Sequence, residues 1–379
     1  MSDILTKYDD LLKDTGPAAV VLQQWLKPVG GDIIFPPTYA NPSQRKGDPP
    51  VYNIDRFGET VNLGKRFTKF ERSHTFMDET RVEMGQGHSV CVIDSVPSQA
   101  NRIEPAFARI TDQDGKPIRL VPTVIVKVRV DDQIQERSLL DHAGHRAADA
   151  LILSSTLRDK VTKAIKARQQ NDSGPLAKLA PTSLVFGMWD SRETGTKVPR
   201  LINSIIRAYD VLEHRRSSQF NAAIDYEAAG VVPGQGDKKL SEVGMDSAPA
   251  VFQHGGIEAR GGIRRDASLN LCTLRDIVSA TPEATEALQR YILGLSLVAM
   301  TYFDGKTLNL RQGCQLVAIP DKPMKRILIH ADGTETPLEI DRETAIRYAG
   351  AAADRFGVGE DHKDASFDPK LAKNALRKT

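Results

Sequence analysis

The chain has 379 residues, of which 40% are hydrophobic and 26% charged, and this composition excludes a largely disordered protein. Its 51 basic and 49 acidic side chains leave a formal charge of +2, so polyanion binding would have to depend on local placement of basic residues. Three scattered cysteines, Cys91, Cys272 and Cys314, lack C-x-x-C spacing, which argues against a disulfide framework or zinc ribbon and favours a reduced, cytoplasmic compartment.

The first 60 residues predict little regular structure. Residues 3–14 predict a short helix, and residues 27–60 are rich in Pro, Gly and Asn, which predicts a long irregular segment.

The apolar run at 292–300 is far shorter than the roughly 20 residues that a spanning helix needs. We therefore expect no membrane segment.

A strand followed directly by a helix is predicted near residue 90. Residues 88–94 are β-branched and apolar, which predicts a buried strand. Ser95 can cap a helix in which an apolar stripe faces inward, and Pro105 should end or kink it. Ser98, Gln99 and Arg102 then fall on the opposite, polar face, with Asn101 beside it.

The middle of the chain alternates between helix and strand signals. Residues 118–130 predict a strand broken at Pro122, and residues 143–169 a helix. Residues 183–190 and 201–213 predict further strands, the second because polar and apolar residues alternate.

The last third contains the clearest helix. Residues 228–262 are Gly-rich and predict mostly loop, whereas Thr281 and Pro282 begin a helix with a long apolar stripe. The remaining expected elements are a strand at 266–274, a strand at 314–319, a hairpin around Asp332-Gly333, a helix at 341–356 and a disordered tail at 360–379.

Together these elements predict one elaborated α+β domain over residues 1–379. Strands and helices interleave without a regular βαβ rhythm, and hairpin signals are frequent, so an antiparallel sheet is favoured. We expect an inserted helical region over about residues 105–180.

No catalytic motif stands out. Asp141, His142, His145 and Asp149 could approach one another on a helix turn and bind a metal, but their spacing is not that of H-E-x-x-H. His145 and Asp149, four residues apart, are more simply a pair on a helix surface. There is no G-x-S-x-G and no G-x-x-x-x-G-K-[ST] sequence. We therefore expect no metal and no cofactor.

Two local clusters suggest nucleic acid instead. Ser98, Gln99, Asn101 and Arg102 would lie in the first turns of a helix, where amide groups favour phosphate. Trp189 lies in a Gly-containing segment with basic neighbours, which suits base stacking with phosphate contact. Those neighbours are Arg192, Lys197, Arg200 and Arg207. The first cluster could also be an ordinary solvated helix face. In the second, Trp189 could belong to the core and the charges to an ordinary loop. Further basic candidates are Arg45, Lys46, Lys65, Arg66, Arg264 and Arg265.

The sequence resembles a known family at five segments that occur in the expected order. They are CVIDSVPSQANRIEP, FGMWDS, KVPRLINSIIRAYDV, KLSEVGMDSAPA and LRQGCQLVA. These segments are similar to the RAMP-superfamily backbone subunit, of the Cas-seven group, in type I-G (formerly I-U) Cascade complexes.

The resemblance implies a modified RNA-recognition (ferredoxin-like) palm with a helical insertion and a thumb, for which residues 33–60 and 214–262 are candidates. It also implies a multicopy subunit that holds CRISPR guide RNA by its backbone and presents it to target DNA, alongside copies of itself and other Cascade subunits. The segment Ser98–Arg102 is the first choice for guide contact and the basic residues near Trp189 the second. The alternatives are an RNA endonuclease on the same fold and a metal enzyme at Asp141, His142 and His145.

Overall fold

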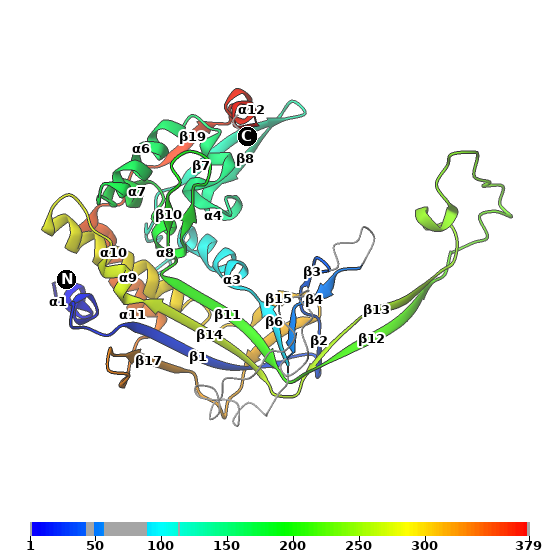
Figure 1. Cartoon of the computed structure of the whole chain (residues 1–379), viewed down its shortest axis with the longest axis horizontal. Coiled ribbons are helices and arrows are strands. Elements are labelled where there is room, and N and C mark those ends of the chain that lie inside the picture. The colour runs from blue at the N-terminus through cyan, green and yellow to red at the C-terminus, as the bar shows by residue number, and fades with distance from the viewer. Residues whose placement is uncertain (1, 43–48, 57–88, 113, 377–379) are drawn as a thin grey trace, which may run out of the picture.

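The computed structural model describes residues 2–42, 49–56, 89–112 and 114–376 of the chain. At its centre lies a curled antiparallel sheet (Figure 1). In pairing order its strands are β15 (Leu308–Arg311), β16 (Cys314–Ala318), β1 (Ala19–Pro28), β14 (Ile263–Asn270), β11 (Ile202–Tyr209), β6 (Ser89–Asp94) and β5 (Ile54–Arg56). In addition, β17 (Lys325–Ile329) pairs with β1 and with β18 (Glu335–Pro337).

The four central positions of this sheet have the order of an RNA-recognition palm. β1 lies between β14 on one side and β16 and β17 on the other, and β14 also pairs with β11, always antiparallel. Helices connect β1 to β11 and β14 to β16, which is the split βαβ arrangement of ferredoxin-like folds. The predicted α+β class and antiparallel sheet are confirmed. The sequence analysis did not predict β1, although its burial alternates residue by residue.

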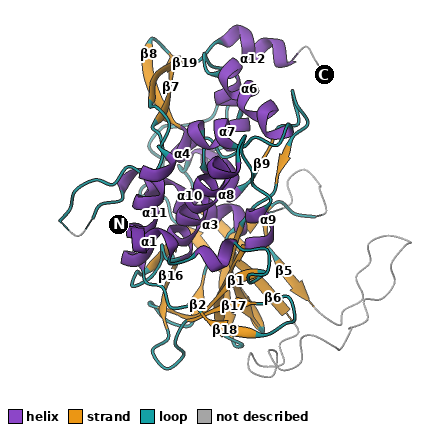
Figure 2. Cartoon of the chain, turned by 90° about the vertical axis from the view of Figure 1, so that its left-hand side faces the viewer, coloured by secondary structure: helices purple, strands orange, loops and turns teal. Residues whose placement is uncertain are grey.

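The helices α10 (Pro282–Met300) and α11 (Arg342–Phe356) cover one face of the palm (Figure 2). Both predicted helices are confirmed, with Thr281 and Asp341 as their N-caps. A Cβ on Gly294 would lie 2.8 Å from the Cα of Ala349, so glycine lets the two helices approach closely. The helix predicted at 3–14 is instead α1 (Ser2–Thr6) and a short 3-10 helix (Asp9–Leu12), while α9 (Leu271–Arg275) ends the strand predicted to reach residue 274.

A helical lobe is inserted between α3 (Val96–Ile103) and β11. Its elements are a 3-10 helix (Glu104–Arg109), β7 (Val124–Val130), β8 (Gln133–Ser138), α4 (Leu139–His142), a 3-10 helix (Arg146–Ala148), α5 (Ala150–Leu153), α6 (Arg158–Gln169), α7 (Gly174–Leu179) and α8 (Thr182–Phe186). The single helix predicted at 143–169 is therefore three pieces. The strand predicted at 183–190 is mostly the fully buried helix α8. Asp131 and Asp132 both have positive φ, so they turn β7 into β8 as a hairpin.

The predicted disordered tail is ordered over much of its length. β19 (His362–Ser366) pairs in parallel with β7, and α12 (Pro369–Leu376) follows it. Asp361 accepts a hydrogen bond from the Arg119 side chain, at 2.8 Å, and Lys127 pairs with Asp364 at 2.7 Å. These charge pairs join sequence-distant segments, which a local reading of composition could not reveal.

A long two-stranded arm projects from the palm (Figure 1). We use "arm" for residues 211–259, which contain β12 (Val211–Phe220), β13 (Ala248–Ala259) and a connecting loop with a 3-10 helix (Leu240–Val243). The prediction that residues 228–262 are mostly loop is therefore wrong for β13. Much of the hairpin is exposed on both faces, so no apolar alternation marks it. At its root, β2 (Ile33–Ile34) pairs with β13, and β3 (Thr38–Tyr39) pairs with β4 (Val51–Tyr52).

Candidate nucleic-acid interface

The predicted strand–helix junction at Ser95 is confirmed. Ser95 caps α3 by accepting a hydrogen bond from the Ser98 amide, and Pro97 fits the first turn. Ala100 and Ile103 are buried, as the apolar stripe predicts. The start of α3 is thereby fixed at the edge of the palm sheet.

The opposite face of α3 is not the solvated surface that the sequence suggested. The side chains of Ser98 and Gln99 both donate to the carboxylate of Asp94, the last residue of β6. Asp94 and Gln99 are 0% exposed, and the amide oxygen of Gln99 accepts a hydrogen bond from Ser204 at 3.0 Å. A buried carboxylate needs donors, and the polar residues of the first helical turns supply them. Gln99 therefore does not lie at the surface, where guide contact was predicted.

Two arginines, one in helix α3 and one in strand β15, meet at the same carboxylate. Arg102 Nε donates to Asp94 at 3.0 Å, and its Nη2 donates to the carbonyl of Leu310 in β15 at 2.7 Å. Arg311 donates to the carbonyl of Ile93 in β6 at 2.9 Å and lies 3.5 Å from Asp94. Since β15 and β6 are not paired neighbours in the sheet, these side chains join two strands that no backbone hydrogen bonds connect.

We call Asp94, Ser98, Gln99, Arg102 and Arg311 the Asp94 node. The side chains of Arg102 and Arg311 remain 29% and 26% exposed, and Asn101 beside them is exposed. Two guanidinium groups share one carboxylate here, so positive charge is left over at the surface, next to a helix N-terminus. Such a surface suits a phosphate group, which accepts charge-assisted hydrogen bonds from arginine.

Sequence reasoning missed two residues of this node, Asp94 and Arg311, and the neighbouring Tyr39. Burial raises the pKa of Tyr39, whose hydroxyl also hydrogen-bonds Ser95. Burial likewise raises the pKa of the neighbouring Cys314 thiol to about 11. The segments CVIDSVPSQANRIEP and LRQGCQLVA both stood out in the sequence. Their meeting could not be seen there, because it depends on how the sheet curls.

The second predicted cluster forms an exposed hairpin of β9 (Met188–Trp189) and β10 (Lys197–Val198). Trp189 is 55% exposed, and the Lys197 ammonium lies 4.9 Å from its ring centroid. The buried Asp190 accepts hydrogen bonds from the amides of Arg192 and Thr194, which fixes the turn. Trp189, Arg192 and Lys197 thus lie together at the surface, and their contact with RNA stays a prediction. The structure does not bring it into contact with the Asp94 node through any described hydrogen bond.

Arg200 belongs to the interior of the helical lobe more than to this hairpin. Burial lowers its pKa, as does the nearby Arg146 guanidinium. Arg146 pairs with the buried Glu104 at 2.9 Å. Burial raises the pKa of Glu104, and Arg146 opposes that rise.

Arg207 and Arg264 are cross-strand partners on the face of the sheet that lies away from the helices. Arg264 pairs with Asp266 at 2.7 Å and packs 5.5 Å from the Trp25 ring centroid and 5.7 Å from that of Tyr209. The aromatic surface of this face thus already contacts cations of the protein itself.

The prediction that Arg265 contacts RNA is wrong, because its side chain is buried. It is 0% exposed, donates to Ser204 at 3.2 Å and lies 4.8 Å from the ring centroid of Phe303. Adjacent residues of a strand point to opposite faces, so Arg264 and Arg265 cannot share a surface. Four other predicted contacts lie outside the described residues: Arg45, Lys46, Lys65 and Arg66.

The alternative metal site is not assembled. Asp141 pairs with Arg109 at 3.3 Å, and Nδ1 of His142 accepts a hydrogen bond from the Ser138 amide at 3.1 Å. The amide of His145 donates to Asp149, which caps α5. Within the described residues, no group of three or more His, Cys, Asp and Glu side chains could hold a metal ion.

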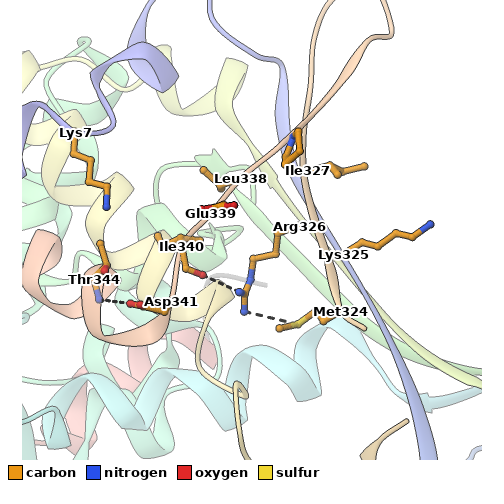
Figure 3. Close-up of a pocket in the computed structure, with 11 residues that line it drawn as sticks. Lys7, Met324, Lys325, Arg326, Ile327, Leu338, Glu339, Ile340, Asp341 and Thr344 are labelled. Atoms are coloured by element: carbon orange, nitrogen blue, oxygen red, sulfur yellow. Dashed lines mark hydrogen bonds between the residues drawn. The ribbon is translucent and has the colours of Figure 1, made fainter. Parts of the chain in front are cut away.

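A cavity of about 710 Å³ lies between the N-terminal segment, the β17–β18 hairpin and the start of α11 (Figure 3). Two of its charged lining residues, Arg326 and Asp341, make structural hydrogen bonds. Arg326 donates to the Ile340 carbonyl at 2.8 Å, and Asp341 accepts from the Thr344 amide. None of the predicted site residues lines this cavity.

Comparison with known proteins gives one family match. The described part of the chain contains no helix that is both long and apolar enough to cross a membrane. No curated protein matches the sequence. The family described as CRISPR-associated protein GSU0053 matches residues 20–213, which is just over half of the chain. The matched segment runs from β1 to the start of the arm and includes every residue of the Asp94 node except Arg311. The chain therefore belongs to the CRISPR-associated protein GSU0053 family.

Proposed function

We propose that this chain is a multicopy backbone subunit of a type I-G CRISPR surveillance complex, of the Cas-seven group. In this proposal it is non-catalytic, works in the cytoplasm and binds guide RNA through the sugar-phosphate backbone. Copies of the chain and other Cascade subunits are its protein partners, and the guide pairs with target DNA.

The observation that carries the proposal is the Asp94 node. It fixes Arg102 and Arg311 beside the first turn of α3 and leaves part of each guanidinium accessible. Phosphate contacts from arginine and helix N-termini position a nucleic acid without reading its sequence. A subunit that delegates sequence selection to base pairing needs this kind of contact.

The architecture gives further support. An RNA-recognition palm carries a projecting arm, and the Trp189 hairpin adds an exposed aromatic beside Lys197. The formal charge of +2 is compatible with the proposal, because a single basic surface is enough for strand binding.

The proposal is tested by the binding of purified full-length chain to single-stranded RNA at several salt concentrations. Each neutralised phosphate should steepen the log-log salt dependence by about −0.7. Affinity should be similar for RNAs of unrelated sequence, and longer RNAs should take up more copies, measured by mass photometry. An affinity that does not respond to salt, or a single copy at every RNA length, would count against the proposal.

The endonuclease alternative requires a separate measurement. RNA-loaded protein is incubated with labelled complementary RNA and Mg²⁺ or Mn²⁺. We expect the complementary strand to stay intact, and regularly spaced cuts would replace our proposal with a nuclease.

A further inference from the structure

A cavity of about 360 Å³ opens at the root of the arm. Three separate parts of the chain line it. The segment from β2 to β4 contributes Phe35, Thr38 and Tyr52, while β12 contributes Arg216 and β13 contributes His254. These residues lie within the two thumb candidates, 33–60 and 214–262, but the sequence could not show that they meet, because their neighbourhood depends on the pairing of β2 with β13.

One wall of this arm-root cavity is a stack built on Phe35. Gly313, at φ +72°, lies so close that a Cβ there would come within 2.7 Å of the ring, and the Phe35 amide donates to the Gly313 carbonyl at 3.0 Å. The Arg216 guanidinium lies 5.2 Å from the ring centroid. Gly313 thus seats the ring, and Arg216 presents a flat, exposed cation at the cavity.

A second pair of rings completes the lining. Tyr52 is buried, and its ring centroid lies 4.7 Å from that of His254, with the two planes tilted by 47°. Nε2 of His254 is buried and has no hydrogen-bond partner among the described residues. A buried polar atom without a partner is costly, and a bound group could satisfy it.

We propose that the arm-root cavity binds one nucleobase, held by Arg216 and the rings of Phe35, Tyr52 and His254. Flat π-systems stack on aromatic rings and on guanidinium planes, and Arg216 would also attract the attached phosphate. The described lining residues include no carboxylate that would repel it. This inference rests on the proposed function for the source of the base, which is a bound RNA strand. A free nucleotide would carry the same chemistry.

The test combines base removal with substitution of the wall. Full-length wild-type chain and the Phe35→Leu and Arg216→Ala variants are titrated with RNAs that carry one abasic site, moved one position at a time. Phe35→Leu keeps apolar packing on Gly313 but removes the aromatic face. Phe220→Ala is the matched control, because Phe220 is an exposed aromatic at the far end of β12 and does not line the cavity.

We expect abasic sites at particular positions to weaken wild-type binding about fivefold or more, the range that loss of one stacked base produces. The same abasic sites should have little further effect in Phe35→Leu or Arg216→Ala, and their full effect in Phe220→Ala. Thermal unfolding checks that each variant is folded, and either wall variant alone suffices for the comparison.

A second titration uses 2-aminopurine riboside monophosphate without RNA. If RNA binds but no position depends on the wall variants, the nucleobase assignment is overturned while the proposed function survives. If RNA does not bind but the free nucleotide does, and Phe35→Leu abolishes its fluorescence change, the cavity assignment stands and the proposed function fails. Binding of neither overturns both.

Discussion

Two groups of arginine and carboxylate residues belong to the same sheet but differ in what they can do. At the Asp94 node, Arg102 in α3 and Arg311 in the edge strand β15 are 29% and 26% exposed. Below the middle strand β14, Arg265 is 0% exposed. Asp304 and Arg326 pair with each other nearby. The chemistry of the two groups is alike, so burial decides which guanidinium groups can reach a ligand.

Burial also changes the ionisation of the second group. It lowers the pKa of Arg265 to about 10, even though Asp304 acts in the opposite direction. Burial raises the pKa of Asp304, with Arg326 opposing the rise. We infer that this group stabilises the palm, whereas the node both closes the sheet and presents charge.

The largest expected effect is on stability, from Asp94→Asn. The substitution removes the charge that Arg102 and Arg311 share and replaces one acceptor oxygen with a donor. Loss of one partner from a buried ion pair costs about 3–5 kcal/mol. Urea denaturation of wild type and variant measures the change in the free energy of unfolding.

Asp10→Asn is the control for this prediction. Asp10 pairs with Lys13 at the surface, where its side chain is 85% exposed, so its loss should cost about 0.5 kcal/mol or less. Equal losses in both variants would show that the Asp94 node does not close the sheet.

The next prediction separates the two arginine groups by RNA affinity. Arg102→Ala should weaken binding about tenfold for all RNA sequences and make the salt slope shallower by about 0.7, the share of one phosphate contact. Arg265→Met keeps a long side chain beneath the sheet and should leave RNA affinity unchanged. A larger loss of affinity in Arg265→Met than in Arg102→Ala would reverse our assignment of the two groups.

The sequence predicted the elements that carry their own local signals. Thr281 with Pro282 marked α10, and Ser95 marked α3, because caps and apolar stripes act within a few residues. It missed β8, a polar hairpin strand, and β13, whose glycines and irregular sequence hide the alternation of a strand; both pair with a neighbouring hairpin strand. The ordered tail was missed for a related reason, since its partners Arg119 and Lys127 lie far away in the sequence.

The sequence predicted three members of the Asp94 node, Ser98, Gln99 and Arg102, but it did not predict how they are arranged. Arg102 and Ser98 were selected as surface groups, and the structure instead turns them toward Asp94. Arg311, the other arginine at this carboxylate, comes from β15, far along the chain, and no local pattern can indicate that contact. Arg264 and Arg265 were treated as equivalent, although strand alternation alone predicts that they face opposite sides.

A third arginine–carboxylate contact, at the start of β19, extends the comparison to the surface. Burial alone would raise the pKa of Asp361, but hydrogen bonds from Arg119, the Thr123 amide and Lys363 outweigh it and lower the pKa to about 2. A depressed carboxylate pKa stabilises the fold above its ordinary value near 3.8, and this stabilisation is lost as the pH falls toward 2. Because Arg119 is 50% exposed, we expect Asp361→Asn to cost only about 1 kcal/mol at neutral pH.

Denaturation at several pH values measures this contribution. The difference in the free energy of unfolding between wild type and Asp361→Asn should be constant from pH 7 to 5 and shrink between pH 4 and 2. Asp364→Asn is the comparison variant: the hydrogen bond from Lys127 also lowers the pKa of Asp364, but its side chain is 88% exposed, so the same pH trend should be smaller. A difference that grows as the pH falls would contradict the assignment.

The smallest effect on stability is expected at the Trp189 hairpin, where cation and aromatic group are both exposed. The indole contacts Lys197, and an exposed contact of this kind contributes about 0.5 kcal/mol, so Trp189→Ala should unfold almost like wild type. If the hairpin belongs to the RNA interface, the same variant should bind single-stranded RNA a few-fold more weakly, because base stacking on an aromatic ring is lost. Trp189→Phe should restore most of that affinity. Unchanged binding in Trp189→Ala would exclude this hairpin from the RNA interface and leave the Asp94 node and the arm-root cavity as its proposed parts.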